Sequence, residues 1–324
     1  VNIDLQKLGV RFLMDTSGKQ LIDWNQLSKD DIVIIPAFGT TIEIEQQLNE
    51  IGINPYRYNT TCPFVEKVWN RSEQLGRDNF TVIIHGKSYH EETRATFSHS
   101  KTKAASVIVR DIEETKLLAS FILNEKSEDE FYKTFAGRYS EGFNFNKDFQ
   151  KIGVVNQTTM LATETQAIAD LLKETMIEKY GVENIKNHFA DTRDTLCYAT
   201  NDNQEATYGL LKENSDFAIV VGGYNSSNTS HIVELCEEKL PTYFISSEEK
   251  VLNDKVIRHF NIHQQKEIET EDYMASKDVI DIILTSGASC PDAVVEAVLR
   301  KVHSFFPTAK NVDEVIDRFL ITKE

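Results

Sequence analysis

Basic residues are scarce in this sequence. The 35 lysine and arginine residues stand against 51 aspartate and glutamate residues, which gives a formal net charge of −16 at pH 7. This balance argues against a nucleic-acid or anionic-membrane partner, because both require clustered lysine and arginine. Long apolar runs are missing as well, since none approaches the roughly 18 residues of a membrane span, and no signal peptide is visible. We therefore expect a soluble protein with neither nucleic acid nor a membrane among its partners.

Cysteine is also sparse, with four residues that show no tight spacing of the secreted type. This usage fits a reducing compartment, in which thiols serve metal binding or chemistry. The 324 residues and the 40% hydrophobic content suffice for two or three domains with real cores.

Two similar stretches stand out from this background. Thr60-Thr61-Cys62-Pro63-Phe64-Val65 returns in modified form as Thr195-Leu196-Cys197-Tyr198-Ala199-Thr200. Each cysteine opens an amphipathic helical pattern, which leads at nearly the same spacing into an apolar strand and a glycine, Gly86 in the first case and Gly222 in the second. The shared order predicts one supersecondary unit used twice, with equivalent thiols on neighbouring modules.

The remaining elements follow an α/β rhythm. We expect a helix near residues 4–8, a strand over 32–35, a helix over 43–51 and further strands beginning at residues 81, 152, 217 and 282. Each strand is short and apolar on both faces, as in a covered parallel sheet. Residues 111–150 break this rhythm with acidic and aromatic side chains. We interpret them as a peripheral insertion of helix and loop.

Hydroxyl and amide side chains follow several of the expected strands, directly before helix starts. They are Thr158-Thr159, Ser226-Ser227-Asn228, Ser289 and the loop from His90 to Glu92. Each helix N-terminus offers unpaired N–H groups and a partial positive charge, so several that converge make an anion site without a basic protein. Each residue alone is equally an ordinary helix cap. Together they favour a phosphorylated small molecule as the ligand.

His90 and Glu92 are separated by one residue in an expected loop, so both are able to face one cleft. This arrangement places a cation and an acid together. A carboxyl beside a bound anion has its pKa raised and delivers a proton near neutral pH. The alternative is a solvated polar loop.

Cys62 and Cys197 permit several interpretations. A free cysteine is often only a small buried hydrophobic residue. The internal repeat makes iron–sulfur ligation competitive, because thiolates on separate modules can meet at a pseudo-symmetry axis. A catalytic thiol is the weaker alternative, since neither cysteine has a histidine beside it in the sequence. Zinc is disfavoured by the lack of Cys-x-x-Cys or His-x-x-x-His spacing.

Taken together, these residues resemble the 4-hydroxy-3-methylbut-2-enyl diphosphate reductase family over nearly the whole chain. The turn Pro36-Ala37-Phe38-Gly39 and the insertion are similar to the cyanobacterial and plastid branch. Six motifs in the family's order carry the resemblance: Thr61-Cys62-Pro63, His90-x-Glu92, Gln157-Thr158-Thr159, Cys197-x-Ala199-Thr200, Asn225-Ser226-Ser227-Asn228 and Gly287-Ala288-Ser289-x-Pro291-Asp292.

The resemblance implies an α/β fold of three pseudo-symmetric modules, arranged as a trefoil around a central iron–sulfur cluster. The modules are expected at residues 1–61, N-terminally incomplete, at 62–196 with the acidic insertion at about 111–150, and at 197–324 with the C-terminal helices. A 4Fe-4S cluster would be held by Cys62, Cys197 and a third cysteine expected upstream of Val1. Neither Cys236, expected in the core, nor Cys290 lies at an equivalent position, so neither is expected to replace it.

The resemblance also implies a reaction and its residues. Glu92 would donate a proton, and Thr158 would hydrogen-bond near the substrate hydroxyl. Two electrons would arrive from an external donor such as ferredoxin or flavodoxin, the hydroxyl would leave as water, and the products would be isopentenyl and dimethylallyl diphosphate. The implied compartment is a bacterial cytoplasm or a plastid stroma. The diphosphate would be bound by His90, Ser226, Ser227, Asn228 and Ser289.

Phe38 departs from the shorter bacterial enzymes, which carry a diphosphate-binding histidine there, so that contact is expected to be absent. The alternative function from another class is a non-catalytic α/β repeat protein that binds a phosphorylated small molecule without redox chemistry. Reconstitution with iron and sulfide separates the two, because only the reductase becomes brown.

Overall fold

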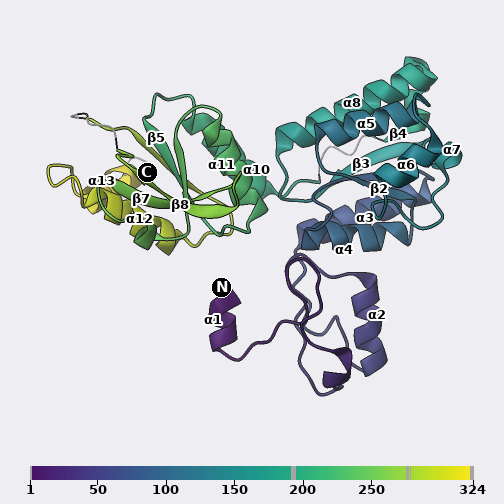
Figure 1. Ribbon diagram of the computed structural model, residues 1–324, viewed down its shortest axis with the longest axis horizontal. Coiled ribbons are helices and arrows are strands. Elements are labelled where there is room, and N and C mark those ends of the chain that lie inside the picture. Colours follow the sequence, from purple (N-terminus) through teal and green to yellow (C-terminus); the bar gives the residue numbers. More distant parts are fainter. Residues whose placement is uncertain (1, 191–194, 275–276, 278, 322–324) are drawn as a thin grey trace. The chain divides into compact units, whose positions relative to one another are not determined.

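The computed structural model describes residues 2–190, 195–274, 277 and 279–321. The fold is α/β with parallel sheets. The chain divides into two compact units, Val1–Cys197 and Tyr198–Glu324 (Figure 1). The division into three modules stays a prediction. None of the helices in the described ranges combines the length and the hydropathy that a membrane crossing needs.

The first part of unit 1 contains helices and loops around a small core of Ile35, Leu48 and Ile53. Its elements are α1 (Asn2–Lys7), the 3-10 helix η1 (Trp24–Gln26) and α2 (Ile42–Ile51). The strand predicted over 32–35 is wrong: only Ile35 makes a bridge, to Asn59, while Ile32 and Ile34 are 71% and 59% exposed. An apolar run pairs as a strand only where a neighbouring strand completes its hydrogen bonds.

A parallel four-stranded sheet in the order β2-β1-β3-β4 organises the rest of unit 1. The residues of β1, β2 and β3 are all buried, as expected for a sheet covered on both faces. Helices α3 and α4 pack together on one face, and α5 and α8 pack together on the other (Figure 1). The strands are β1 (Thr81–His85), β2 (Ser106–Val109), β3 (Ile152–Asn156) and β4 (Phe189–Ala190); the helices are α3 (Pro63–Arg77), α4 (Glu91–Lys101), α5 (Ile112–Ile122) and α8 (Ala162–Tyr180). The short elements η2 (Val182–Asn184) and α9 (Ile185–His188) precede β4.

The acidic, aromatic stretch after residue 111 forms part of the core. It folds into α5, α6 (Glu128–Thr134) and α7 (Phe145–Asp148). Its aromatic rings pack against β2, β3 and α8 in one cluster of buried side chains, so the peripheral placement predicted for it is wrong. The rings that surround Phe131 are those of Phe121, Tyr132, Phe135, Tyr139, Phe143, Phe145 and Phe149.

Unit 2 contains a parallel three-stranded sheet in the order β6-β5-β9. Helix α12 packs its Val298 and Val302 into the cluster that contains Phe217 and Ile219 of β5, while α10 and α11 pack together on the sheet (Figure 1). An antiparallel hairpin of β7 and β8 lies beside β6. The elements are α10 (Tyr198–Leu210), β5 (Phe217–Val221), α11 (Ser227–Glu237), β6 (Thr242–Ile245), η3 (Glu248–Lys250), β7 (Val256–Asn261), β8 (Lys266–Glu271), β9 (Ile282–Ser286), α12 (Asp292–His303) and α13 (Val312–Ile321).

The two sheets repeat one connectivity. In unit 1 the order is α3-β1-α4-β2, and β3 then pairs with the free side of β1; in unit 2 the order is α10-β5-α11-β6, and β9 pairs with the free side of β5. Cys62 precedes the first series and Cys197 the second. The repeated unit predicted from the cysteine spacing is present, and it assigns equivalent positions to residues in the two units.

Candidate active site

The repeated cysteines lie at equivalent helix starts. Cys62 is the N-cap of α3, whose first residue is Pro63, and Cys197 directly precedes α10. Their backbone N–H groups donate to the carbonyl oxygens of Ala37 at 2.9 Å and Thr158 at 3.3 Å. Both thiols are free and partly buried, and both belong to unit 1.

Free, partly buried thiols are the donor type that an iron–sulfur group requires. Within the described ranges, no three histidine, cysteine, aspartate or glutamate side chains gather closely enough to hold a metal ion. The chemistry of the two thiols therefore fits such a group, while a complete ligand set is not found among the residues that the structure describes.

Glu92 lies in the first turn of α4, whereas the sequence interpretation placed it in a loop. Its side chain is fully buried. Oε1 accepts a hydrogen bond from the Thr158 N–H at 2.5 Å, and Oε2 accepts one from Thr158 Oγ1 at 3.0 Å. Burial raises the pKa of the Glu92 carboxyl to about 7, although both hydrogen bonds act to lower it. Desolvation by the protein therefore suffices to poise this acid near neutral pH, without the bound anion invoked from the sequence.

His90 is the N-cap of α4, and its Nδ1 accepts the Glu92 N–H at 3.2 Å. A nitrogen that accepts carries no hydrogen, so in the neutral ring the proton lies on Nε2. The ring of Phe38 meets this imidazole edge-on, with 5.2 Å between the ring centroids. Phe38 therefore packs against the histidine that is predicted to bind the diphosphate.

Gln157 connects the ends of β1 and β3. Its Oε1 accepts hydrogen bonds from Thr93 Oγ1 at 2.9 Å and from the Lys87 N–H at 3.2 Å, and its Nε2 donates to Thr159 Oγ1 at 2.7 Å. Its backbone N–H donates to the carbonyl of His85 at 2.8 Å. Gln157 belongs to one of the six motifs, but the sequence assigned it no role. In the structure its hydrogen bonds hold the start of the turn that contains Thr158.

The serine-asparagine motif forms the N-terminus of α11 in unit 2. Ser226 is the N-cap, and its Oγ accepts the Thr229 N–H at 3.3 Å. Ser227 and Asn228 follow in the first turn and are buried. No acidic residue lies in this turn, so the partial positive charge of the helix end is not neutralised there.

Glycines allow both site helices to approach the strand ends closely. A Cβ at Gly287 would lie 2.0 Å from Thr229 Oγ1, and one at Gly222 would lie 2.7 Å from the same oxygen. In unit 1, a Cβ at Gly86 would lie 2.5 Å from Thr93 Oγ1. Thr93 and Thr229 each lie three residues after their N-cap. Neither threonine was predicted as a site residue. The available signal was their equal sequence spacing, since each follows the glycine at its strand end by seven residues.

The remaining predicted residues lie in unit 2. Ser289 is exposed in the turn between β9 and α12. Cys236 is fully buried in α11, as predicted, and burial raises the pKa of its thiol to about 12. Cys290 is partly buried, and burial raises its pKa as well.

Two buried histidines near the site were assigned no role from the sequence. His85 ends β1, and its Nδ1 lies 2.9 Å from Thr165 Oγ1. His231 lies in α11, and its Nδ1 lies 2.7 Å from Glu234 Oε2. The available signal for His231 was its place three residues after Asn228, the last residue of the serine-asparagine motif.

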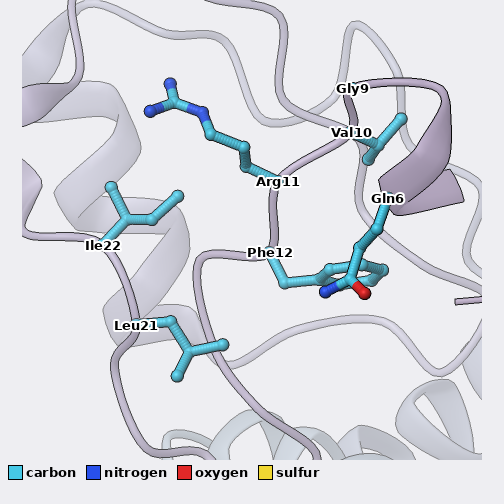
Figure 2. A pocket seen from close by; sticks show the side chains of 7 residues that line it. All are labelled: Gln6, Gly9, Val10, Arg11, Phe12, Leu21 and Ile22. Atoms are coloured by element: carbon cyan, nitrogen blue, oxygen red, sulfur yellow. The ribbon is translucent and has the colours of Figure 1, made fainter. Parts of the chain in front are cut away.

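A separate hollow of about 450 Å³ lies in the N-terminal part of unit 1 (Figure 2). It contains none of the predicted site residues and offers one charged side chain, Arg11. Its lining consists of Gln6, Gly9, Val10, Arg11, Phe12, Leu21 and Ile22. It is therefore not part of the candidate active site.

Polar groups thus gather at the carboxyl ends of parallel strands in both units, where α/β enzymes bind their ligands. The chain is therefore an α/β protein whose candidate ligand-binding residues lie at the carboxyl ends of its parallel strands. These residues include a buried acid, Glu92, and two free thiols at helix starts. It belongs to the LytB family, since the family model described as LytB protein matches residues 1–303.

Named relatives agree with this assignment. The 4-hydroxy-3-methylbut-2-enyl diphosphate reductase of a Picosynechococcus strain is 39% identical over 305 residues, which cover 94% of this chain and 73% of that protein. The protein of the same name from Thermosynechococcus vestitus is 40% identical over the same coverage. The resemblance inferred from the six motifs, including its cyanobacterial character, is confirmed.

A solved structure supports the fold. The E-1-hydroxy-2-methyl-but-2-enyl-4-diphosphate reductase from Plasmodium falciparum superposes with a TM-score of 0.60 at 19% identity, covering 93% of this chain and 81% of that one. At this identity the likeness concerns the fold alone.

Proposed function

We propose that the protein catalyses the reductive dehydroxylation of 4-hydroxy-3-methylbut-2-enyl diphosphate, the last step of the non-mevalonate isoprenoid pathway. The observation that carries this proposal is the 39% identity, over 94% of the chain, to a reductase of that name. The alternative of a non-catalytic binding protein has no comparable support.

The reaction balances with two electrons and two protons. The substrate C–O bond breaks, one proton leaves with the hydroxyl as water, and the other joins the allylic carbon skeleton to give isopentenyl or dimethylallyl diphosphate. Glu92 is the proposed source of a proton, because a carboxyl with a pKa of about 7 is partly protonated at neutral pH. Thr158 donates hydrogen bonds to both oxygens of Glu92 and thereby holds the carboxyl in one orientation.

Cys62 and Cys197 are the proposed thiolate ligands of the cofactor. The LytB family is known as a family of iron–sulfur enzymes. When bound, such a group supplies the electrons that the reaction consumes. The carbonyl of Thr158 accepts the Cys197 N–H, so one residue fixes the backbone of a proposed ligand and the carboxyl of the proposed acid. The 4Fe-4S type, the third ligand, the trefoil, the electron donor and the compartment stay predictions.

The diphosphate is the proposed ligand of polar groups at helix starts. His90 is the N-cap of α4, and Ser226 is the N-cap of α11, whose first turn carries no acidic residue, so the positive end of each helix dipole favours an anion. An acidic protein is able to bind a diphosphate through such groups, because helix N-termini need no surrounding lysine or arginine. The complete proposed set is His90, Thr158, Ser226, Ser227, Asn228 and Ser289.

Product analysis tests this function directly. The full-length protein is reconstituted anaerobically with iron and sulfide and supplied with dithionite, a mediator and the substrate. We expect a brown protein that forms isopentenyl and dimethylallyl diphosphate. A protein that binds the substrate yet returns it unchanged would favour the alternative of a non-catalytic binding protein.

A further inference from the structure

Two buried polar side chains in the first turns of α11 have atoms without a hydrogen-bond partner within the described part of the chain. Asn228 and His231 are each only 3% exposed. The atoms without a partner are Nδ2 and Oδ1 of Asn228 and Nε2 of His231. Buried polar atoms are nearly always hydrogen-bonded, so three unsatisfied atoms on one helix indicate a group that binds there.

Helix geometry places these atoms on one face. Residues three apart on a helix are neighbours, and their side chains lean toward the N-terminus of the helix. The imidazole of His231 therefore extends over the turn that contains Asn228 and Ser227. This is the end of α11 at which Ser226 forms the N-cap and no acidic residue lies in the first turn.

Glu234 determines which end of the His231 ring is available. Its Oε2 lies 2.7 Å from Nδ1, and a carboxylate only accepts, so Nδ1 carries a hydrogen. Carboxylate partners of this kind fix the orientation of a histidine whose other nitrogen binds a ligand. Nε2 is the nitrogen that remains for such a ligand.

In the equivalent turn of unit 1, the buried side chain has hydrogen-bond partners within the protein. Glu92 lies two residues after the N-cap of α4, as Asn228 does after the N-cap of α11, and both of its oxygens are bonded to Thr158. In unit 2 the residue that corresponds to Thr158 is Ala288, which has no hydroxyl. The residue that corresponds to His231 is Ala95. At these positions unit 2 thus gains an imidazole and loses the hydroxyl that bonds the buried side chain of unit 1.

We propose that His231, held by Glu234, binds the substrate diphosphate together with Asn228. This inference rests on the proposed function and adds a ligand to that site. An oxyanion only accepts hydrogen bonds, so His231 binds it through an Nε2–H, as an imidazolium between the phosphate oxygen and the Glu234 carboxylate. Asn228 contributes its Nδ2 hydrogens to the same group.

Binding of inorganic diphosphate tests the proposal without turnover. Titration calorimetry on the full-length protein compares the wild type with His231→Leu, His231→Gln and Glu234→Gln. We expect His231→Leu to raise the Kd about tenfold, which corresponds to one charge-assisted hydrogen bond. His231→Gln retains an N–H at a similar reach and is expected to recover most of that loss. Glu234→Gln is expected to fall between the wild type and His231→Leu.

The same helix provides a matched control. Glu237 accepts from His263 Nε2 at 2.8 Å, which is a second glutamate–histidine pair, but its histidine side chain is 70% exposed whereas that of His231 is 4% exposed. Glu237→Gln is expected to bind diphosphate with the wild-type Kd. An equal loss in Glu237→Gln and Glu234→Gln would contradict a specific role for the His231 pair.

Steady-state kinetics separate this inference from the function on which it rests. If His231 binds diphosphate, His231→Leu raises the KM for the substrate about tenfold with little change in kcat. A lowered melting temperature with unchanged Kd and KM would overturn the inference and leave the reductase function standing. Loss of diphosphate binding in His231→Leu, with a wild type that forms no product, would preserve the inference and refute the function. A wild type that does not bind inorganic diphosphate would also overturn the inference.

Discussion

At the scale of single residues, Glu92 combines complete burial with two hydrogen bonds from one threonine. Its neighbour Glu91 lies on the same helix turn and is only partly buried. Burial opposes the ionised form of a carboxyl, whereas the hydrogen bonds of Thr158 favour it, and burial dominates because the pKa rises to about 7. Because this pKa lies near neutral pH, small changes in the surroundings of Glu92 alter the protonation of its carboxyl.

Replacing Glu92 with glutamine is expected to abolish turnover and to leave the protein folded. The glutamine fills the same volume and still accepts the Thr158 N–H, but it has no proton to release. Product formation by the reconstituted variant should fall by about two orders of magnitude or more, as for loss of a general acid, while the brown colour persists. Glu91→Gln is the matched control and should keep wild-type turnover. Turnover at the wild-type rate in Glu92→Gln would assign the proton donor elsewhere.

The same residue predicts how stability depends on pH. The folded pKa of about 7 lies above the usual value of 4.5, so between these values the folded state binds more protons than the unfolded state. Stability therefore falls as the pH rises from about 4.5 to about 7, by about 3 kcal/mol from this group. Urea unfolding near pH 5 and near pH 8 should show this loss in the wild type and a smaller loss in Glu92→Gln. Equal losses in both proteins would contradict the raised pKa.

At the scale of helices and strands, the sequence predicted those elements that the local pattern of apolar residues determines. The helices after Cys62 and Cys197 and the buried strands β1, β3 and β5 were recognisable from apolar periodicity and from the proline and glycine around them. The strand over 32–35 was wrong because pairing depends on a partner that periodicity does not reveal. The aromatic insertion was misplaced because its phenylalanines bury against β2 and β3, which lie far away in the sequence.

The candidate site divides in the same way. Its motifs were visible because they combine rare residues at fixed spacing. The partners of its residues were not visible, since Thr158 and Glu92 meet only after β1 and β3 have paired. The full burial of Glu92, which raises its pKa, is likewise a property of the folded chain.

Close contact between α11 and β9 makes Gly287 sensitive to any added side chain. The Cβ of alanine would lie 2.0 Å from Thr229 Oγ1 and 3.0 Å from Thr229 Cβ, so the start of α11 has to shift. Gly287→Ala is expected to destabilise the protein by about 1–3 kcal/mol, as overpacking does, and to weaken diphosphate binding. Both are measured by urea unfolding and calorimetry.

Gly209 provides the opposite case for comparison with Gly287. It is the penultimate residue of α10, and a Cβ there meets nothing within 4 Å. Gly209→Ala should stabilise the protein by up to about 1 kcal/mol, because alanine loses less backbone entropy than glycine when a helix forms. A Gly287→Ala variant as stable as the wild type would show that α11 shifts without cost.

At the scale of the whole molecule, the two units repeat one connectivity but have diverged in chemistry. Unit 1 contains both predicted thiolate ligands and the buried acid, while unit 2 contains the serine-asparagine helix start and two further cysteines. In these two cysteines, Cys236 and Cys290, burial raises the pKa, which opposes the thiolate form that binds metals. Repetition of the fold thus does not extend to a third repeated thiolate among the described residues.

Single replacements of the four cysteines in the full-length protein are expected to separate them into two pairs. Cys62→Ser and Cys197→Ser should each abolish the brown colour and lower the iron bound after reconstitution, because serine is a poor substitute for thiolate in an iron–sulfur site. Cys290→Ser and Cys236→Ala should retain both colour and iron, although Cys236→Ala is expected to lose some stability because it leaves a small cavity in a fully buried position. Iron analysis and visible absorption measure the result. Retention of wild-type iron by either Cys62→Ser or Cys197→Ser would refute that residue as a ligand, and loss of iron in Cys290→Ser would transfer the role to unit 2.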